Sequence, residues 1–221
     1  MTALIAATAL FIVTHFVPST PLRPAIVRAI GEGRYRGVYS AIALGGLVWM
    51  SMAYSRAPIE PLWAPLREVP LIVLPFAFVM LACGYWRNPT MVGAERLLKS
   101  EEPARGIIRI TRHPLMWAIM LWALSHVLAR GDLKSVIFFG GLFIVAGLGT
   151  VLMDHRKKSN PDWARFAAAT SNVPFLAIAQ RRNRIVWREI GWLRPFAGII
   201  AFVAFFAVHS SLFGARPYLS A

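Results

Sequence analysis

Six long runs of apolar residues, separated by polar segments, make up most of the sequence. Because lipid offers the backbone no hydrogen-bond partner, an apolar run that crosses a membrane must be helical, and about 20 residues are needed to cross it. The pattern predicts an all-α, polytopic transmembrane bundle of about six spans, forming a single domain over residues 1–221. The predicted spans are Thr2–Val17, Gly37–Ser55, Pro70–Trp86, Pro114–Leu128, Leu133–Met153 and Leu193–Phe213.

The composition agrees with a membrane environment. Hydrophobic residues make up 57% of the chain, charged residues make up 15%, and the mean hydropathy is +0.56. This balance is unsuited to a water-soluble fold with a polar exterior. The formal net charge is +14, but the basic residues lie in short tracts between the apolar runs, where they fix topology and contact anionic lipid. We therefore expect the lipid bilayer, and not nucleic acid, as the partner of these tracts.

The basic residues are concentrated in every second loop. They lie in the segments Arg23–Arg36, Arg87–Arg112 and Arg156–Arg188, after the first, third and fifth predicted spans, whereas the other two loops carry few. The positive-inside rule places arginine-rich loops in the cytoplasm. The sequence thus predicts a multi-pass protein of the bacterial cytoplasmic (inner) membrane, with both termini on the opposite side.

Histidine and carboxylate are the metal ligands that this chain can offer. Its single cysteine, Cys83, lies within an apolar run, which excludes an intramolecular disulfide and a paired-thiol metal site. All five histidines lie in or beside a predicted span. An ionisable group at membrane depth is costly, so each of these histidines is a functional candidate.

Two histidines share their helix faces with small and aromatic residues. The neighbours are Ala7, Thr8 and Phe11 for His15, and Ile119, Trp122 and Ala123 for His126. Two helices of this kind can enclose a flat apolar macrocycle and supply axial imidazoles to its iron. His15 and His126 are therefore the candidate ligands of a haem b.

A structural role for these histidines is the alternative. A lone intramembrane histidine can hydrogen-bond a neighbouring helix, a contact worth about 1 kcal/mol. The predicted topology also puts His15 nearer the cytoplasmic side and His126 nearer the opposite side, so a shared iron requires helix tilt or shifted span boundaries. His209, near the end of the last span, is interpreted as a helix-packing or interfacial group.

The segment Arg109–Pro114 is the most motif-like part of the chain. Proline suits the start of a helix because it has no N–H to lose, and a helix N-terminus favours anions. Arg112 and His113 are thus candidates to bind a phosphate, a carboxylate or a haem propionate. The alternative is a cytoplasmic boundary with basic anchors. The adjoining tract Gly106–Ile110 is amphipathic, and we expect it at the cytoplasmic interface.

Several motifs occur in a characteristic order. They are Thr14-His15-Phe16 followed by Leu22-Arg23, Arg34-Tyr35-Arg36, Ile110-Thr111-Arg112-His113-Pro114, Leu121-Trp122-Ala123-Leu124-Ser125-His126 followed by Gly131-Asp132, and Asp154-His155-Arg156. This combination resembles the NnrU family, whose relatives include the plant and cyanobacterial 15-cis-zeta-carotene isomerases. The resemblance extends over most of the chain.

The resemblance implies a membrane protein that binds haem b non-covalently through histidines at the positions of His15 and His126. In the isomerases a cysteine stands three residues before the second histidine, whereas this chain has Ala123, which departs from ligand-switching isomerase chemistry. For bacterial members the family points to nitric-oxide metabolism during denitrification, and ferrous haem binds nitric oxide. The resemblance leaves nitric oxide and a polyene open as ligands.

Two further hypotheses belong to other functional classes. Arg112-His113-Pro114, with Asp154 at a later helix end, also resembles the isoprenylcysteine carboxyl methyltransferase superfamily, which implies binding of S-adenosylmethionine. Trp117 and Asp154 depart from that pattern, which has an aromatic directly after the proline and a glutamate at the helix end. The third hypothesis is a non-catalytic membrane assembly partner, in which the histidines are packing groups. The catalytic residues stay unassigned.

Overall fold

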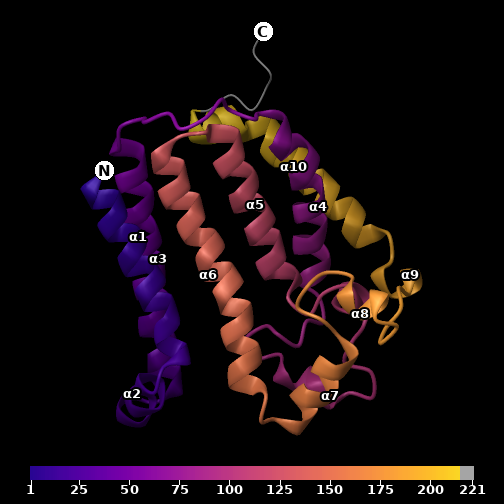
Figure 1. The fold of residues 1–221 in the computed structure, drawn as a ribbon. Coiled ribbons are helices and arrows are strands. Elements are labelled where there is room, and N and C mark those ends of the chain that lie inside the picture. The colour runs from indigo at the N-terminus through magenta and orange to yellow at the C-terminus, as the bar shows by residue number, and fades with distance from the viewer. Residues whose placement is uncertain (215–221) are drawn as a thin grey trace.

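The computed structural model describes residues 1–214, which form ten α-helices and three short 3₁₀ helices (Figure 1). The six long helices are α1 (Thr2–Phe16), α3 (Glu32–Arg56), α4 (Glu68–Gly84), α5 (Pro114–Arg130), α6 (Leu133–Lys157) and α10 (Leu193–Phe213). The shorter elements are η1 (Val17–Ser19), α2 (Leu22–Ile30), η2 (Glu95–Lys99), η3 (Gly106–Arg109), α7 (Pro161–Ala169), α8 (Leu176–Ala179) and α9 (Trp187–Ile190).

The six predicted spans correspond to the six long helices. The segment Thr2–Ser19 and helices α3, α6 and α10 are long and apolar enough to cross a membrane. Helices α4 and α5 are also apolar and have 17 residues each, the short limit for a span. The prediction of an all-α, multi-pass membrane protein with about six spans is confirmed.

Helix α3 is longer than its predicted span at the polar end. It begins at Glu32 instead of Gly37. The Glu32 carboxylate accepts hydrogen bonds from Arg23 at 2.8 Å and from Arg36 at 2.9 Å. Because Glu32 and Arg36 lie one turn apart on the same helix face, their contact stabilises the additional polar turn.

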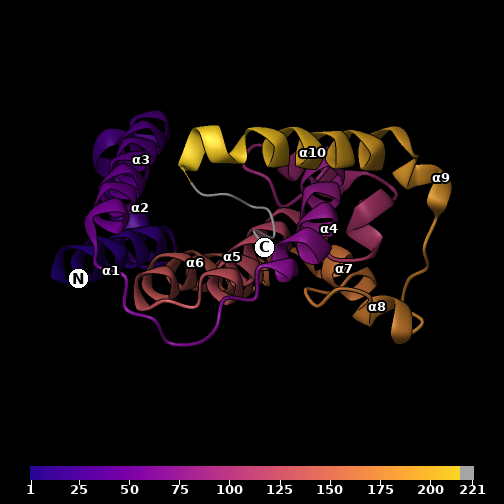
Figure 2. The ribbon, with the colours of Figure 1, turned by 90° about the horizontal axis from the view of Figure 1, so that it is seen from above.

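Helix α6 lies in the middle of the bundle. It packs against α1 on one side and α5 on the other, α3 packs against α1, and α4 links α5 to α10. Figure 2 shows this arrangement from above. The contact between α6 and α1 is close because Gly141 has no side chain and Thr8 packs directly against it. Small residues allow this approach of two membrane helices.

The apolar core is divided between two levels of the bundle. One cluster joins α1, α3, α5 and α6, and the other lies under the short helices. The second cluster contains Ile107, Ile108 and Ile110, packed with Trp163 of α7 and Ile190 of α9. Later parts of the chain thus fold over this tract and bury it, and its place at the cytoplasmic interface stays a prediction.

The arginine-rich segments gather at one end of the bundle. This end carries α2, η3 and α7, and it is the lower end in Figure 1; we call it the basic end. The N-terminus and the turn between α5 and α6 lie at the opposite end. The alternation of basic and non-basic loops along the sequence therefore corresponds to two separate ends of the bundle.

Gly198 is a close contact between α10 and α4. A Cβ atom there would stand 2.8 Å from backbone atoms of Phe78 and Val79. Gly198→Ala should force the two helices apart and lower the free energy of unfolding by about 1–3 kcal/mol. Gly45→Ala on α3 is the control, because no atom lies within 4 Å of its added Cβ. Thermal unfolding in detergent compares the two variants, and equal midpoints would contradict this packing.

Candidate functional site

His15 lies in the last turn of α1 and contacts two aromatic rings. The ring centroids of Phe11 and of Tyr39 from α3 are 4.0 Å and 6.0 Å away. The Nδ1 atom is 2.7 Å from the Phe11 carbonyl oxygen. Because a carbonyl only accepts hydrogen bonds, Nδ1 carries the hydrogen, and in the neutral ring the lone pair lies on Nε2. His15 is thus held in a tautomer that can ligate metal through Nε2.

His126 repeats this arrangement in α5. Its Nδ1 donates to the Trp122 carbonyl at 2.8 Å, which again leaves the lone pair on Nε2. The ring packs against Trp122 and against Phe139 of α6, with centroids 4.9 Å and 5.0 Å away. Phe138 and Tyr54 extend this group of aromatic rings. His126 therefore combines a ligating nitrogen with an aromatic environment inside the bundle.

The structure does not bring His15 and His126 together, because α6 lies between α1 and α5 (Figure 2). The two rings are also offset along the bundle. Thr8 of α1 packs on Gly141 of α6, so these two residues mark one level of the bundle. His15 lies seven residues further along α1 toward the basic end, whereas Phe139, which His126 contacts, precedes Gly141 on the side of the opposite end. At 1.5 Å per residue the offset is about 13 Å. This offset separates the levels at which the two side chains leave their helices, so joint ligation of one iron by His15 and His126 stays a prediction.

Arg112 and His113 meet the same carboxylate at the basic end. Arg112 Nη1 is 3.1 Å from Asp154 Oδ2, and His113 Nε2 is 2.7 Å from Asp154 Oδ1. His113 directly precedes α5 and is 1% exposed, while Asp154 lies near the end of α6. We call these three residues the Asp154 cluster. It joins the start of one span to the end of the next.

The guanidinium of Arg112 is already engaged by acceptors of the protein. Its Nη2 donates to the carbonyls of Ala167 and Thr170 at 3.3 Å and 3.0 Å. Its backbone N–H donates to the Ser171 carbonyl at 2.8 Å. Within residues 1–214, Arg112 Nε and His113 Nδ1 are buried without a hydrogen-bond partner. Asp154 and the backbone carbonyls thus occupy the two Nη atoms of the guanidinium, and Nε is the donor that they leave over.

The Asp154 cluster has no net charge at neutral pH. Burial lowers the pKa of His113, and the Asp154 carboxylate offsets this effect only in part. The ring is therefore neutral at pH 7, with Nε2 donating to Asp154. Burial also lowers the pKa of Arg112, but a guanidinium stays protonated in proteins. One buried cation thus faces one carboxylate, an arrangement suited to holding the helices together.

A second buried ion pair at the basic end was missed by the sequence analysis. Arg109 donates from Nε and Nη2 to the two carboxylate oxygens of Glu189, each at 2.8 Å. Asn183 and Glu102 accept from the same guanidinium. The arginine lowers the pKa of Glu189 to about 2. Because Glu189 follows Arg109 by 80 residues, no local spacing in the sequence indicates this pair.

The comparison with protein families covers nearly the whole chain. Residues 3–217 match the family described as NnrU protein. The chain belongs to the NnrU family. The match includes His15, His126 and both buried ion pairs of this NnrU chain. No solved structure matches it.

Among curated proteins, the NnrU chain is similar to 15-cis-zeta-carotene isomerase, chloroplastic, from Arabidopsis thaliana. The two are 26% identical over 166 residues. The aligned part is 71% of this chain and 45% of the isomerase, so the chain spans less than half the length of that relative. The family resemblance seen in the ordered motifs is thus confirmed.

Removing the shared carboxylate should destabilise the NnrU chain. Asp154→Ala leaves the Arg112 guanidinium buried without its counter-ion, and breaking one side of such a pair costs about 3–5 kcal/mol. We expect a loss near the lower end of this range, measured as the midpoint of thermal unfolding in detergent. Glu60→Ala, an exposed carboxylate at the opposite end, is the control. An Asp154→Ala midpoint equal to that of the control would exclude the stabilising role.

Acid should weaken the contact between Arg109 and Glu189. The Glu189 pKa is lowered from 4.5 to about 2, so the folded chain keeps this carboxylate ionised where the unfolded chain protonates it. The stabilisation, on the order of 3 kcal/mol, is fully present above about pH 4.5 and is lost as the pH falls toward 2. Glu189→Gln should therefore be less stable at neutral pH and should lose less stability between about pH 5 and pH 3. A variant as acid-sensitive as the wild type would contradict this.

Proposed function

We propose that this chain is a haem b-binding membrane protein in which His126 is an axial ligand of the iron. The main support is the tautomer of His126, whose Nδ1 donates to the Trp122 carbonyl at 2.8 Å and leaves Nε2 unprotonated. Histidine is a common axial ligand of haem iron. The rings of Trp122 and Phe139 beside it supply flat apolar surface of the kind on which a porphyrin packs.

His126 is a better ligand candidate than His15 because of where the two rings lie. His126 packs on Phe139, a residue of the cluster that joins α1, α3, α5 and α6. His15 contacts Phe11 and Tyr39 near the basic end of α1 and α3. Since α6 lies between α1 and α5, we propose a role for His15 apart from the iron on His126. We likewise assign Arg112 and His113 to the Asp154 cluster and not to a propionate.

Nitric oxide is the ligand that we propose for the bound haem. Ferrous haem binds nitric oxide, and the resemblance to NnrU proteins implies a role in nitric-oxide metabolism. Isomerisation of a polyene is the second candidate, supported by the similarity to the isomerase. Ala123 stands where the isomerase pattern has a cysteine, which favours the first candidate. The positive-inside rule places the basic end in the cytoplasm of a bacterial cell, with the chain in the cytoplasmic membrane.

Methyl transfer and a purely structural role account for fewer of the contacts. A site for S-adenosylmethionine would need Arg112 and His113, whose Nη and Nε2 atoms bind Asp154 and backbone carbonyls. A non-catalytic assembly partner gives no reason for a histidine that presents Nε2 inside a span. It predicts that removing the His126 imidazole leaves the properties of the protein unchanged.

An absorption spectrum tests the haem proposal directly. Protein purified in detergent from haem-replete cells should show a Soret band that shifts on reduction with dithionite. His126→Ala should lose most of this band because the variant lacks the proposed axial imidazole. His15→Ala should retain it. His155→Ala, which removes an exposed histidine at the basic end, is the control and should also retain it.

Two results would contradict the proposal in different ways. A colourless wild-type protein would exclude haem binding and turn attention to S-adenosylmethionine. Loss of the band in both His15→Ala and His126→Ala would instead favour ligation by both histidines.

A further inference from the structure

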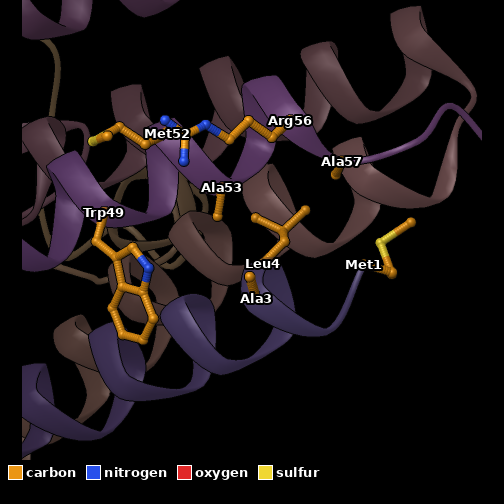
Figure 3. Close-up of a pocket in the computed structure, with 8 residues that line it drawn as sticks. All are labelled: Met1, Ala3, Leu4, Trp49, Met52, Ala53, Arg56 and Ala57. Atoms are coloured by element: carbon orange, nitrogen blue, oxygen red, sulfur yellow. The ribbon is translucent and has the colours of Figure 1, made fainter.

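A small cavity opens between α1 and α3 at the end opposite to the basic end. Its volume is about 150 Å³, and its lining is formed by Met1, Ala3, Leu4, Trp49, Met52, Ala53, Arg56 and Ala57 (Figure 3). We call it the α1–α3 groove. Leu4 and Ala53 are buried, while Trp49 and Met52 are exposed. An apolar cavity of about this size accommodates a molecule as large as benzene, so the groove can hold part of a lipid but not a haem.

Two positive charges flank this groove. Arg56 lies in the last turn of α3 and is one of the lining residues drawn in Figure 3. Lys134 of α6 is buried and donates from Nζ to the Ala57 carbonyl at 3.2 Å. Within residues 1–214, neither cation forms an ion pair, and no carboxylate lines the groove. Lys134 also lies over the Tyr54 ring, 5.0 Å from its centroid, so Arg56 is the charge that the groove offers to an anion.

The depth of the groove matches the level of lipid headgroups. Leu4 belongs to the first turn of α1 and Arg56 to the last turn of α3, so both lie where a span meets the membrane surface. Trp49 forms one face of the groove, and tryptophan is enriched at the interface between membrane and water. An occupant at this depth has a polar head beside the arginine and an apolar part next to Leu4 and Ala53.

We propose that the α1–α3 groove binds one anionic phospholipid, with its phosphate next to Arg56 and the first part of an acyl chain on Leu4 and Ala53. The charge of the groove selects an anionic head, and the apolar floor selects a lipid over a soluble phosphate. The site is independent of His126, so the failure of one proposal leaves the other intact.

Native mass spectrometry of the full-length chain tests the lipid site. The detergent-purified protein is titrated with phosphatidylglycerol and with phosphatidylcholine of identical acyl chains. The wild type should retain one phosphatidylglycerol in preference to phosphatidylcholine. Arg56→Gln should weaken that retention about fivefold, the effect expected for one basic side chain at the membrane surface. Ala3→Phe, at an exposed position of the groove, should fill the groove and reduce the retention of both lipids.

Arg34→Gln is the matched control, because it removes an exposed arginine from the other end of the same helix. It should leave the single tightly held lipid in place. Equal loss in Arg34→Gln and Arg56→Gln would overturn the proposal in favour of general attraction between lipid and the arginines. Equal retention of both lipids by the wild type, or displacement of the lipid by inorganic phosphate, would also overturn it. Because the altered side chains are exposed, the variants should unfold at the same thermal midpoint as the wild type when no lipid is added. If Arg56→Gln and Ala3→Phe are folded by this measure and still retain phosphatidylglycerol as tightly as the wild type, the site is refuted.

Discussion

The hydrocarbon interior of a bilayer offers no partner for a hydrogen bond, and this constraint governs the structure of the chain. It makes the backbone helical in all six spans, so that each helix satisfies its own N–H and C=O groups. It also governs the polar side chains inside the spans. His15 and His126 each donate to the carbonyl four residues earlier in the same helix. The same bond that satisfies the imidazole fixes its tautomer, and the nitrogen left over is the one that can ligate a metal.

At the basic end the constraint is different, because arginines are abundant there and some of them are buried. They are buried under the short helices that cover this end of the bundle, which we call the cap. Arginine is needed in these loops to fix the topology, yet burying a guanidinium costs several kcal/mol unless an acid accompanies it. Asp154 and Glu189 supply that acid for Arg112 and Arg109. Each pair connects segments that are distant in the sequence. The cap is therefore held by a few buried ion pairs over an apolar cluster that includes Ile108 and Trp163.

Helix α6 determines which functional side chains can meet. It separates α1 from α5, so the two histidines with ligating nitrogens face different parts of the bundle. Because the chain belongs to the NnrU family and is similar to a 15-cis-zeta-carotene isomerase, both histidines are candidates for a functional role. The packing around α6 gives the two rings different surroundings, because His126 lies against the shared aromatic cluster and His15 lies near the basic end. Position in the bundle, and not residue type, is the reason why we propose different roles for them.

The sequence by itself determined the class of fold, the six spans and the separation of basic from non-basic loops. Each of these depends on a run of neighbouring residues and on the solvent that surrounds it, so local patterns suffice. The tautomers of His15 and His126 are local in the same sense, since the accepting carbonyl is one helical turn away. Tertiary structure alone decided the partners of Arg109 and Arg112 and the burial of Gly106–Ile110. Those features require segments 40 to 80 residues apart to meet, and hydrophobic periodicity carries no information about which segments do so.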